Sequence, residues 1–166
     1  MALKLTLTAS IVGALTGDND LVTVSAPIDI KKVVNLTTGS GLNQAGDAFA
    51  DRRTLAAGAS EGLDLSGGLF DVFGVALNFT KIKAIEIIAA AANTNDVVLG
   101  GAAANAFVGP FGAADDTCTV PPGGVVMLVN PTAAGWPVTP GTGDLLKVAN
   151  SAGGTAVTYD IVIVGA

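Results

Sequence analysis

The chain of 166 residues is half hydrophobic, contains no histidine, and carries 8 basic and 14 acidic residues for a net charge of −6. Its length suits one domain with a sizeable core. The absence of histidine excludes Ser-His-Asp and Cys-His catalytic systems and histidine metal ligands, and the acidic balance disfavours nucleic-acid binding, which needs a basic face.

The low charge predicts an unusual surface. Only 13% of the residues are charged, whereas soluble domains usually carry about 25%. A compact protein of this mass exposes about 7,500 Å². We therefore expect a surface rich in Thr, Ser, Asn and Gly, a surface covered by neighbouring subunits, or both.

The N-terminal third predicts strands and turns. Residues 4–12 alternate as a strand rather than a signal peptide, with Leu5, Leu7 and Ala9 on one face. The sequence Gly17-Asp18-Asn19-Asp20 predicts a turn, and strands follow over residues 21–25 and 28–36, separated by Pro27. Asp18 and Asp20 are weak candidates for a calcium-type metal site. The alternative interpretation is a turn held by Asx hydrogen bonds.

Residues 37–68 are small, polar and rich in glycine. We expect a long loop or arm that leaves the domain to contact a neighbour, with a strand near residues 53–59. A helical turn over residues 44–55 is the alternative, which Gly46 disfavours. Four of these residues are candidate interface residues: Asn43, Phe49, Arg52 and Arg53. The arginine pair could bind an acidic partner in a bidentate contact, or form a solvated strand end.

The middle of the chain predicts core elements. Residues 69–79 hold Phe70, Phe73 and Phe79 and are expected to cross the core. Residues 81–90 form a strand whose apolar phase slips, which predicts either a bulge near Ala84 or burial on both faces. A short strand over residues 97–99 and a loop over residues 102–116 follow.

The last third is the most regular. Strands are predicted over residues 118–120, 125–129 and 144–149, and Cys118 is expected to be a small half-buried hydrophobe. Trp136, in a proline-rich loop, is a candidate lid, subunit contact or ligand platform. In the final strand Val157, Tyr159, Ile161 and Ile163 share an inward phase, so we expect that strand to be central.

These elements predict an all-β fold. About eight to ten strands with no helix between them favour an antiparallel β-sandwich, jelly-roll-like, in a single domain over residues 1–166 with the excursion at 37–68. Two uncharged stretches, residues 97–114 and 117–143, are interrupted by glycine and proline and so do not predict membrane spans.

The C-terminal part resembles small structural proteins of tailed bacteriophages. The resemblance is carried by VPPGGVVMLVNPTAAGWPVTPGTGDLLKVANSAGGTAVTYDIVIVGA, above all in residues 121–124, 130–136, 143–150 and 157–165, and by residues 53–65 and 79–87. These segments mark turns and strands, so they transfer no functional residues. The resemblance implies a virion component built on a β-sandwich.

Composition and resemblance together predict a function. We expect a capsid decoration (cement) protein on the outside of a phage head, made in the host cytoplasm. Its predicted partners are itself, as a homotrimer, and the major capsid protein, with no nucleic acid and no membrane. The chain has no cofactor motif, so we expect no cofactor and no enzymatic activity. The alternative is a tail or fibre component that binds host glycan through end loops, with Trp136, Asp115 and Asp116 as candidates.

Overall fold

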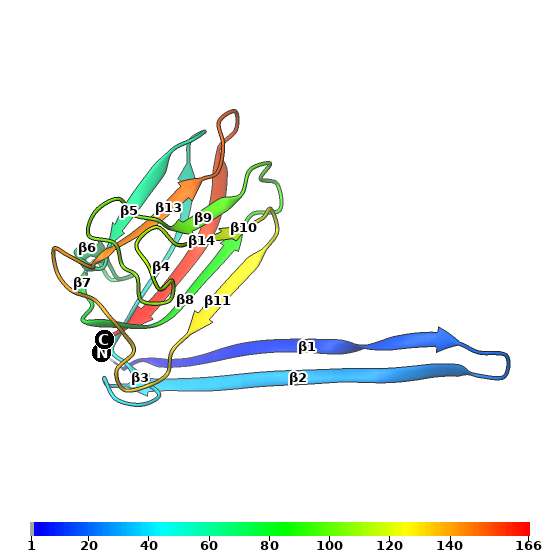
Figure 1. Ribbon diagram of the computed structural model, residues 1–166. Coiled ribbons are helices and arrows are strands. Elements are labelled where there is room, and N and C mark those ends of the chain that lie inside the picture. Colours follow the sequence, from blue (N-terminus) through cyan, green and yellow to red (C-terminus); the bar gives the residue numbers. More distant parts are fainter. Residues whose placement is uncertain (1) are drawn as a thin grey trace.

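A computed structural model describes residues 2–166 as an all-β protein with two distinct parts (Figure 1). One part is a sandwich of antiparallel sheets, and the other is a long hairpin that projects from its lower end. The predicted all-β antiparallel sandwich is confirmed. Residues 2–166 form fourteen strands rather than eight to ten. The jelly-roll connectivity stays a prediction.

The larger sheet of the sandwich has the final strand at its centre. Its order is β11 (Val125–Val129), β8 (Lys81–Ala89), β14 (Val157–Gly165) and β4 (Asp47–Leu55), and the short β12 (Trp136–Pro137) also pairs with β8. Because β14 lies between β8 and β4, the prediction of a central C-terminal strand is confirmed.

The second sheet has four strands. Its order is β10 (Thr117–Val120), β9 (Val97–Gly100), β13 (Leu145–Asn150) and β5 (Ser60–Asp64). A small hairpin of β6 (Ser66–Phe70) and β7 (Ala76–Asn78) lies beside the sheets. The strands predicted in the last third therefore agree with the structure to within about one residue at their ends.

One hydrophobic cluster joins the two sheets. The inward residues of β14 (Val157, Tyr159, Ile161 and Ile163) are buried in the same cluster as Leu99, Leu146 and Val148 of the smaller sheet. Apolar side chains on alternate positions of facing strands produce such a core. Cys118 packs half-buried against it, as predicted.

The phase slip of β8 is a β-bulge. Val164 pairs with Ala84, but Gly165 pairs with Ile82, so Lys83 is the extra residue. Ile82 and Ile85 can therefore both face the core although they are three residues apart. This confirms the predicted bulge near Ala84.

The projecting hairpin consists of β1 (Lys4–Asp18) and β2 (Thr23–Thr38). The two strands pair in continuous antiparallel register from Lys4 with Thr37 to Asp18 with Thr23. The prediction that Pro27 splits the second strand is wrong, because β2 continues through it. Pro27 is tolerated because every other backbone N–H of a two-stranded ribbon points away from the partner strand. The short β3 (Gln44–Ala45) pairs in parallel with the end of β2.

The predicted excursion at residues 37–68 is wrong in position. Most of this segment belongs to the sandwich, because β4 pairs with β14 along its whole length and β5 pairs with β13. Phe49, Leu55, Leu63 and Leu65 lie in the core. The helical alternative over residues 44–55 is also wrong, since this stretch forms β3 and β4. The element that leaves the domain is the N-terminal hairpin.

The prediction that residues 69–79 cross the core is only partly correct. Leu69, Leu77 and Phe79 are buried, whereas Phe70 and Phe73 are exposed near the tip of the β6–β7 hairpin. The protein exposes 8768 Å², roughly 1,300 Å² more than a compact protein of its mass. The projecting hairpin accounts for this excess area, because it exposes both of its faces.

Candidate functional site

The most unusual surface of the molecule is the hairpin of β1 and β2, which we call the arm. Its two faces differ in character, because residues directly opposite each other in the register share a face. One face is apolar apart from a single charged residue, Lys32. The other carries mostly Thr, Ser, Asn, Asp and Lys. We call the first the apolar arm face; its members are Leu5, Leu7, Ala9, Ile11, Gly13, Leu15, Gly17, Val24, Ala26, Ile28, Ile30, Lys32, Val34 and Leu36.

The base of the arm packs on the outside of the larger sheet. Leu36 and Ala45 form a second buried cluster with Ala84 of β8 and Val164 of β14. Leu3, Leu5, Leu7, Val34 and Val129 pack around this cluster. The end of the C-terminal strand, at Val164, is therefore covered on both faces, and the cover on its outer side is the chain's own arm.

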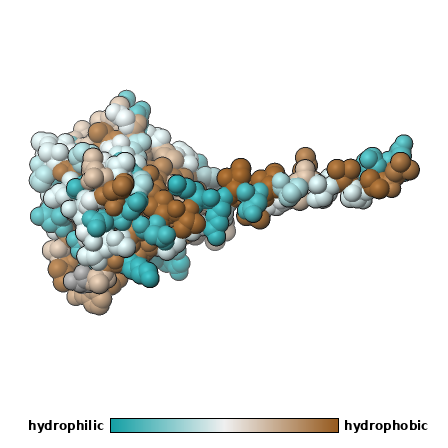
Figure 2. All heavy atoms as spheres, turned by 90° about the horizontal axis from the view of Figure 1, so that it is seen from below, coloured by the Kyte–Doolittle hydropathy of each residue, from teal (hydrophilic) through white to brown (hydrophobic). Residues whose placement is uncertain are grey.

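Beyond its base the arm belongs to neither hydrophobic cluster of the described residues. Every residue from 8 to 33 is exposed, and we call this part the distal arm. Ile11 is 70% exposed, Leu15 72% and Ile30 67%. Hydrophobic residues are visible along the whole projecting part, interleaved with polar ones (Figure 2). Contiguous exposed apolar surface of this kind marks an interaction site.

Two lysines bind the loop that follows β2 (residues 39–43), which we call the arm root, to the sandwich. Lys83, fully buried at the β8 bulge, donates hydrogen bonds from Nζ to the carbonyl oxygens of Gly41 (3.2 Å), Thr132 and Ala133 (3.2 Å). Lys81 donates from Nζ to the carbonyls of Ser40 (3.2 Å) and Ala133 (3.1 Å). Burial, and secondarily the charge of Lys81, lower the pKa of the Lys83 ammonium. The loop after β2 and the loop after β11 are thereby tied to one bulge.

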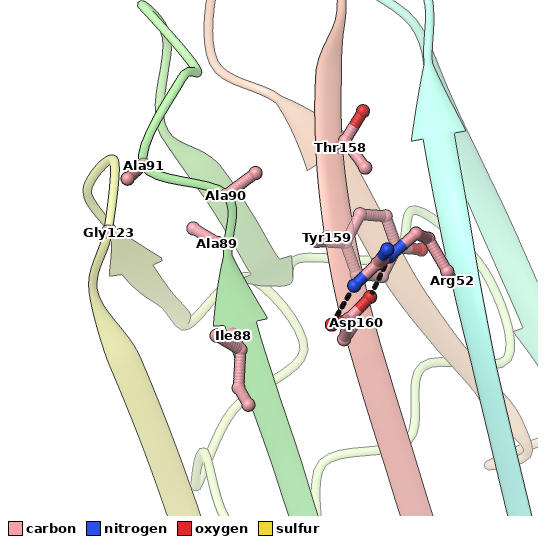
Figure 3. Close-up of a pocket in the computed structure, with 9 residues that line it drawn as sticks. All are labelled: Arg52, Ile88, Ala89, Ala90, Ala91, Gly123, Thr158, Tyr159 and Asp160. Carbon is pink, nitrogen blue, oxygen red and sulfur yellow. Dashed lines mark hydrogen bonds and ion pairs between the residues drawn. The ribbon is translucent and has the colours of Figure 1, made fainter.

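Above the arm base, the outer face of the larger sheet is open. It presents Asp160 and Val162 of β14, of which Val162 still packs against the arm-base cluster, their partners Arg52 and Ala50 of β4, and Glu86 and Ile88 of β8. A shallow hollow of about 450 Å³ lies at its upper end (Figure 3). We call Ala50, Arg52, Glu86, Ile88, Asp160 and Val162 together the outer sheet face.

An ion pair crosses this face. Arg52 binds Asp160 in a bidentate contact, Nε to Oδ1 at 2.6 Å and Nη2 to Oδ2 at 2.8 Å, drawn as dashed lines in Figure 3. The hydrogen bond to Arg52 lowers the pKa of Asp160, and the hydrogen bond to Asp160 raises the pKa of Arg52. The acidic group predicted for Arg52 is thus supplied by its own chain.

A second polar cluster links the two sheets. Tyr159, whose ring is buried, donates its hydroxyl to Glu61 Oε1 at 2.6 Å. Arg53 donates from Nε to Glu61 Oε2 at 2.7 Å and from Nη1 to Asp51 at 2.8 Å. Burial, followed by the hydrogen bond to Glu61, raises the pKa of Tyr159, and the bond to Glu61 raises the pKa of Arg53. These contacts satisfy Arg53 within the sandwich.

The other candidate interface residues do not gather at one place. Phe49 is only 5% exposed and belongs to the core, so its assignment as an interface residue is wrong. Asn43 lies at the arm root with a φ of 53°, where its N–H donates to the Pro131 carbonyl. Trp136 is half-buried against the core cluster and pairs through β12 with Ile82, which favours the lid interpretation.

The remaining candidates lie at the arm tip and in a surface loop. Asn19 Oδ1 accepts hydrogen bonds from the N–H groups of Leu21 and Val22, so an Asx-type turn is confirmed. Asp18 accepts from the Thr23 hydroxyl at 2.7 Å. Among residues 2–166, no three His, Cys, Asp or Glu side chains gather closely enough to hold a metal ion. Asp116 Oδ2 accepts a hydrogen bond from the Ala113 N–H at 3.0 Å within its own loop.

A second exposed apolar patch surrounds the tip of the β6–β7 hairpin. Phe70, Val72, Phe73 and Val75 are each more than half exposed. A hollow of about 310 Å³ lies between this tip, the N-terminal residues and β4. The sequence shows this concentration of phenylalanine, but its pattern predicts burial in the core, whereas the structure exposes Phe70 and Phe73.

Comparisons with known proteins add no relatives. No protein-family model, no curated protein and no solved structure matches this chain. Within the described residues 2–166, no helix is long and apolar enough to cross a membrane.

Proposed function

We propose that this protein is a structural subunit of a virion, a decoration protein that binds the outside of a tailed-phage head. The observation that carries the proposal is the arm: residues 8–33 extend from a folded sandwich with Ile11, Leu15 and Ile30 about 70% exposed. An isolated hairpin is marginally stable in water and needs a hydrophobic face covered by another element. A chain with this arm is therefore built to work beside neighbours.

Composition and resemblance support the same proposal. The chain has few charges, much glycine and no histidine, which suits a subunit whose surface is partly covered. Its C-terminal segments resemble structural proteins of tailed phages. A ligand that binds only the assembled shell stabilises the assembled state. Copies placed at three-fold positions would hide apolar surface through closed symmetry.

The arm can be removed without cutting the sandwich. Ala9 and Lys32 are direct partners in the hairpin register, so an Asn-Gly turn that replaces residues 10–31 closes a short hairpin at that pair. The arm base on the larger sheet stays intact in this variant. We expect its thermal melting temperature to equal that of the full chain within a few degrees, because the removed residues are exposed and belong to neither hydrophobic cluster.

The experiment compares particles that carry the full chain, the shortened chain or neither. Imaging should place the full chain on the head, and heads decorated with it should resist heat or chelator better than bare heads. The shortened chain should bind the head weakly or not at all. Density confined to the tail would refute the proposal, and equal decoration by the shortened chain would show that the arm does not make the contact with the head.

A further inference from the structure

Two surfaces of this chain are left open beside one apolar contact: the apolar face of the distal arm, and the outer sheet face, on which Ile88 is exposed among charged side chains. At the base, Leu5, Leu7 and Leu36 of the apolar arm face pack against Ala84 and Val164 of the larger sheet. The apolar arm face continues into the distal arm. The outer sheet face continues upward from Ala84 and Val164 to Ile88 and Val162.

Within one molecule these two continuations do not meet. The arm crosses the lower end of the larger sheet and then runs away from the sandwich (Figure 1). Ile88 remains 39% exposed and Ile30 67% exposed. A second copy of the chain offers the apolar arm face another stretch of the same strands, β8 and β14, that it packs on at the arm base.

We propose that the distal arm of one copy lies with its apolar face on the outer sheet face of a second copy. The proposal deepens the structural role proposed above and rests on it only in treating the chain as an assembly subunit. It repeats between molecules the packing seen within one molecule. Because arm and sheet are different surfaces, the contact is heterologous and closes into a ring when the rotation between copies permits, a trimer included.

The charges of the two surfaces are compatible. The apolar arm face has one charged residue, Lys32, and on the outer sheet face Glu86 makes no ion pair within the described residues, whereas Arg52 and Asp160 neutralise each other. Residues 4–38 hold three lysines and three aspartates, so the net charge of −6 resides in the rest of the chain. A neutral arm can approach an acidic sandwich without the repulsion that two sandwiches would meet.

The length of the distal arm also fits. From residue 9 to residue 18 the hairpin extends about 30 Å at roughly 3.4 Å per residue. Four strands spaced about 4.8 Å apart span roughly 15–20 Å. The distal arm can therefore cross the whole outer sheet face of a neighbour, as the arm base crosses the lower end of its own sheet.

The test uses two pairs of matched substitutions in the purified protein. Ile11→Asp places a charge on the apolar arm face, and Val12→Asp places the same charge at an equally exposed position (70% for both) on the opposite arm face. Ile88→Asp changes the outer sheet face, and Val108→Asp is its control in a loop, with the same exposure of 39%. All four sites are exposed, and circular dichroism melts verify that each variant folds.

Sedimentation analysis measures the association of each variant. We expect the unmodified chain to form a closed oligomer at micromolar concentration. Ile11→Asp and Ile88→Asp should each weaken association at least about 100-fold, because a carboxylate is buried without a partner. Val12→Asp and Val108→Asp should change it less than about threefold.

Three results would overturn the proposal. A chain that stays monomeric up to about 100 µM makes no such contact. Dissociation by Ile11→Asp but not by Ile88→Asp would mean that arms pack on arms. Equal effects of Ile11→Asp and Val12→Asp would mean that the apolar arm face is not the contact. Because the measurement uses no virion, an oligomer that forms without decorating heads would refute the proposed function and leave this inference standing.

Discussion

Removal of one hydroxyl group tests how the two sheets are held together. Tyr159 is fully buried, and its hydroxyl donates to Glu61 across the gap between β14 and β5 at 2.6 Å. Tyr159→Phe keeps the ring in the core and deletes only this hydrogen bond. Glu61 retains its contact with Arg53, so no carboxylate is left without a partner.

The expected loss is moderate. A hydrogen bond to a charged acceptor contributes about 1.5–3 kcal/mol to the free energy of unfolding. For a chain of this size each kcal/mol shifts the melting temperature by about 2–4 °C, so Tyr159→Phe should melt roughly 3–12 °C lower.

The pH dependence of the difference has a defined sign. Burial and Glu61 raise the pKa of Tyr159 in the folded protein above its ordinary value, which in the unfolded chain is about 10. Below pH 10 the phenol is protonated in both states, and its stabilising contribution is complete. Above pH 10 the unfolded chain loses the proton first, so the contribution falls by about 1.4 kcal/mol for each pH unit until the folded pKa is reached.

The chain has one tyrosine and one tryptophan, which makes both measurements direct. Urea unfolding followed by Trp136 fluorescence at pH 8 and pH 11 gives the stability of each form, and near-ultraviolet absorbance gives the ionisation of Tyr159. The difference in free energy of unfolding between the unmodified chain and Tyr159→Phe should shrink by about 1.4 kcal/mol from pH 8 to pH 11. A folded protein whose tyrosine titrates near pH 10, or parallel stability curves for the two forms, would refute the argument.

The regular strands were predictable because both of their faces obey local rules. In β14, Val157, Tyr159, Ile161 and Ile163 alternate toward the core, as their sequence indicated. The bulge of β8 was visible as a phase slip for the same reason. Such patterns depend only on which side of a strand is buried.

The arm could not be predicted as an arm. Its apolar face alternates in sequence just as a half-buried sandwich strand does, and nothing in the pattern says that its distal part projects from the sandwich. The available signal was length. Register-matched alternation on both sides of the turn at Asn19 gives strands of 15 and 16 residues, whereas strands in globular proteins are usually five or six residues long.

The strand β4 was missed for the opposite reason. On the inward phase, Phe49 and Leu55 are apolar, but Asp51 and Arg53 between them are charged. These two pair with each other, and Arg53 also pairs with Glu61 at the edge of the sandwich. Ion pairs, one of them with Glu61 of β5, take the place of apolar side chains at these two inward positions, so the sequence of β4 lacks the alternating hydrophobic pattern and resembles a loop.

Three further predictions concern the fold and the arm root. Ile161→Ala should cost about 2–5 kcal/mol, because it leaves a cavity in the core, whereas Thr158→Ala, on the outer side, should cost less than about 1.5 kcal/mol; equal losses in thermal melts would contradict the assigned faces. Deletion of residues 43–50 should abolish cooperative unfolding, because it removes half of β4, and a normal melt would contradict the placement of that strand. Lys83→Met should loosen the arm root. The buried ammonium of Lys83 holds carbonyls of two loops. A methionine of similar size removes the donor to the Gly41 and Thr132 carbonyls, whereas the Ala133 carbonyl keeps Lys81 as its donor. Hydrogen exchange should become at least about tenfold faster in residues 39–45 and stay unchanged in β14. Lys81→Met is the matched control, since water can replace its more exposed ammonium, and equal acceleration in both variants would show that Lys83 is not the anchor.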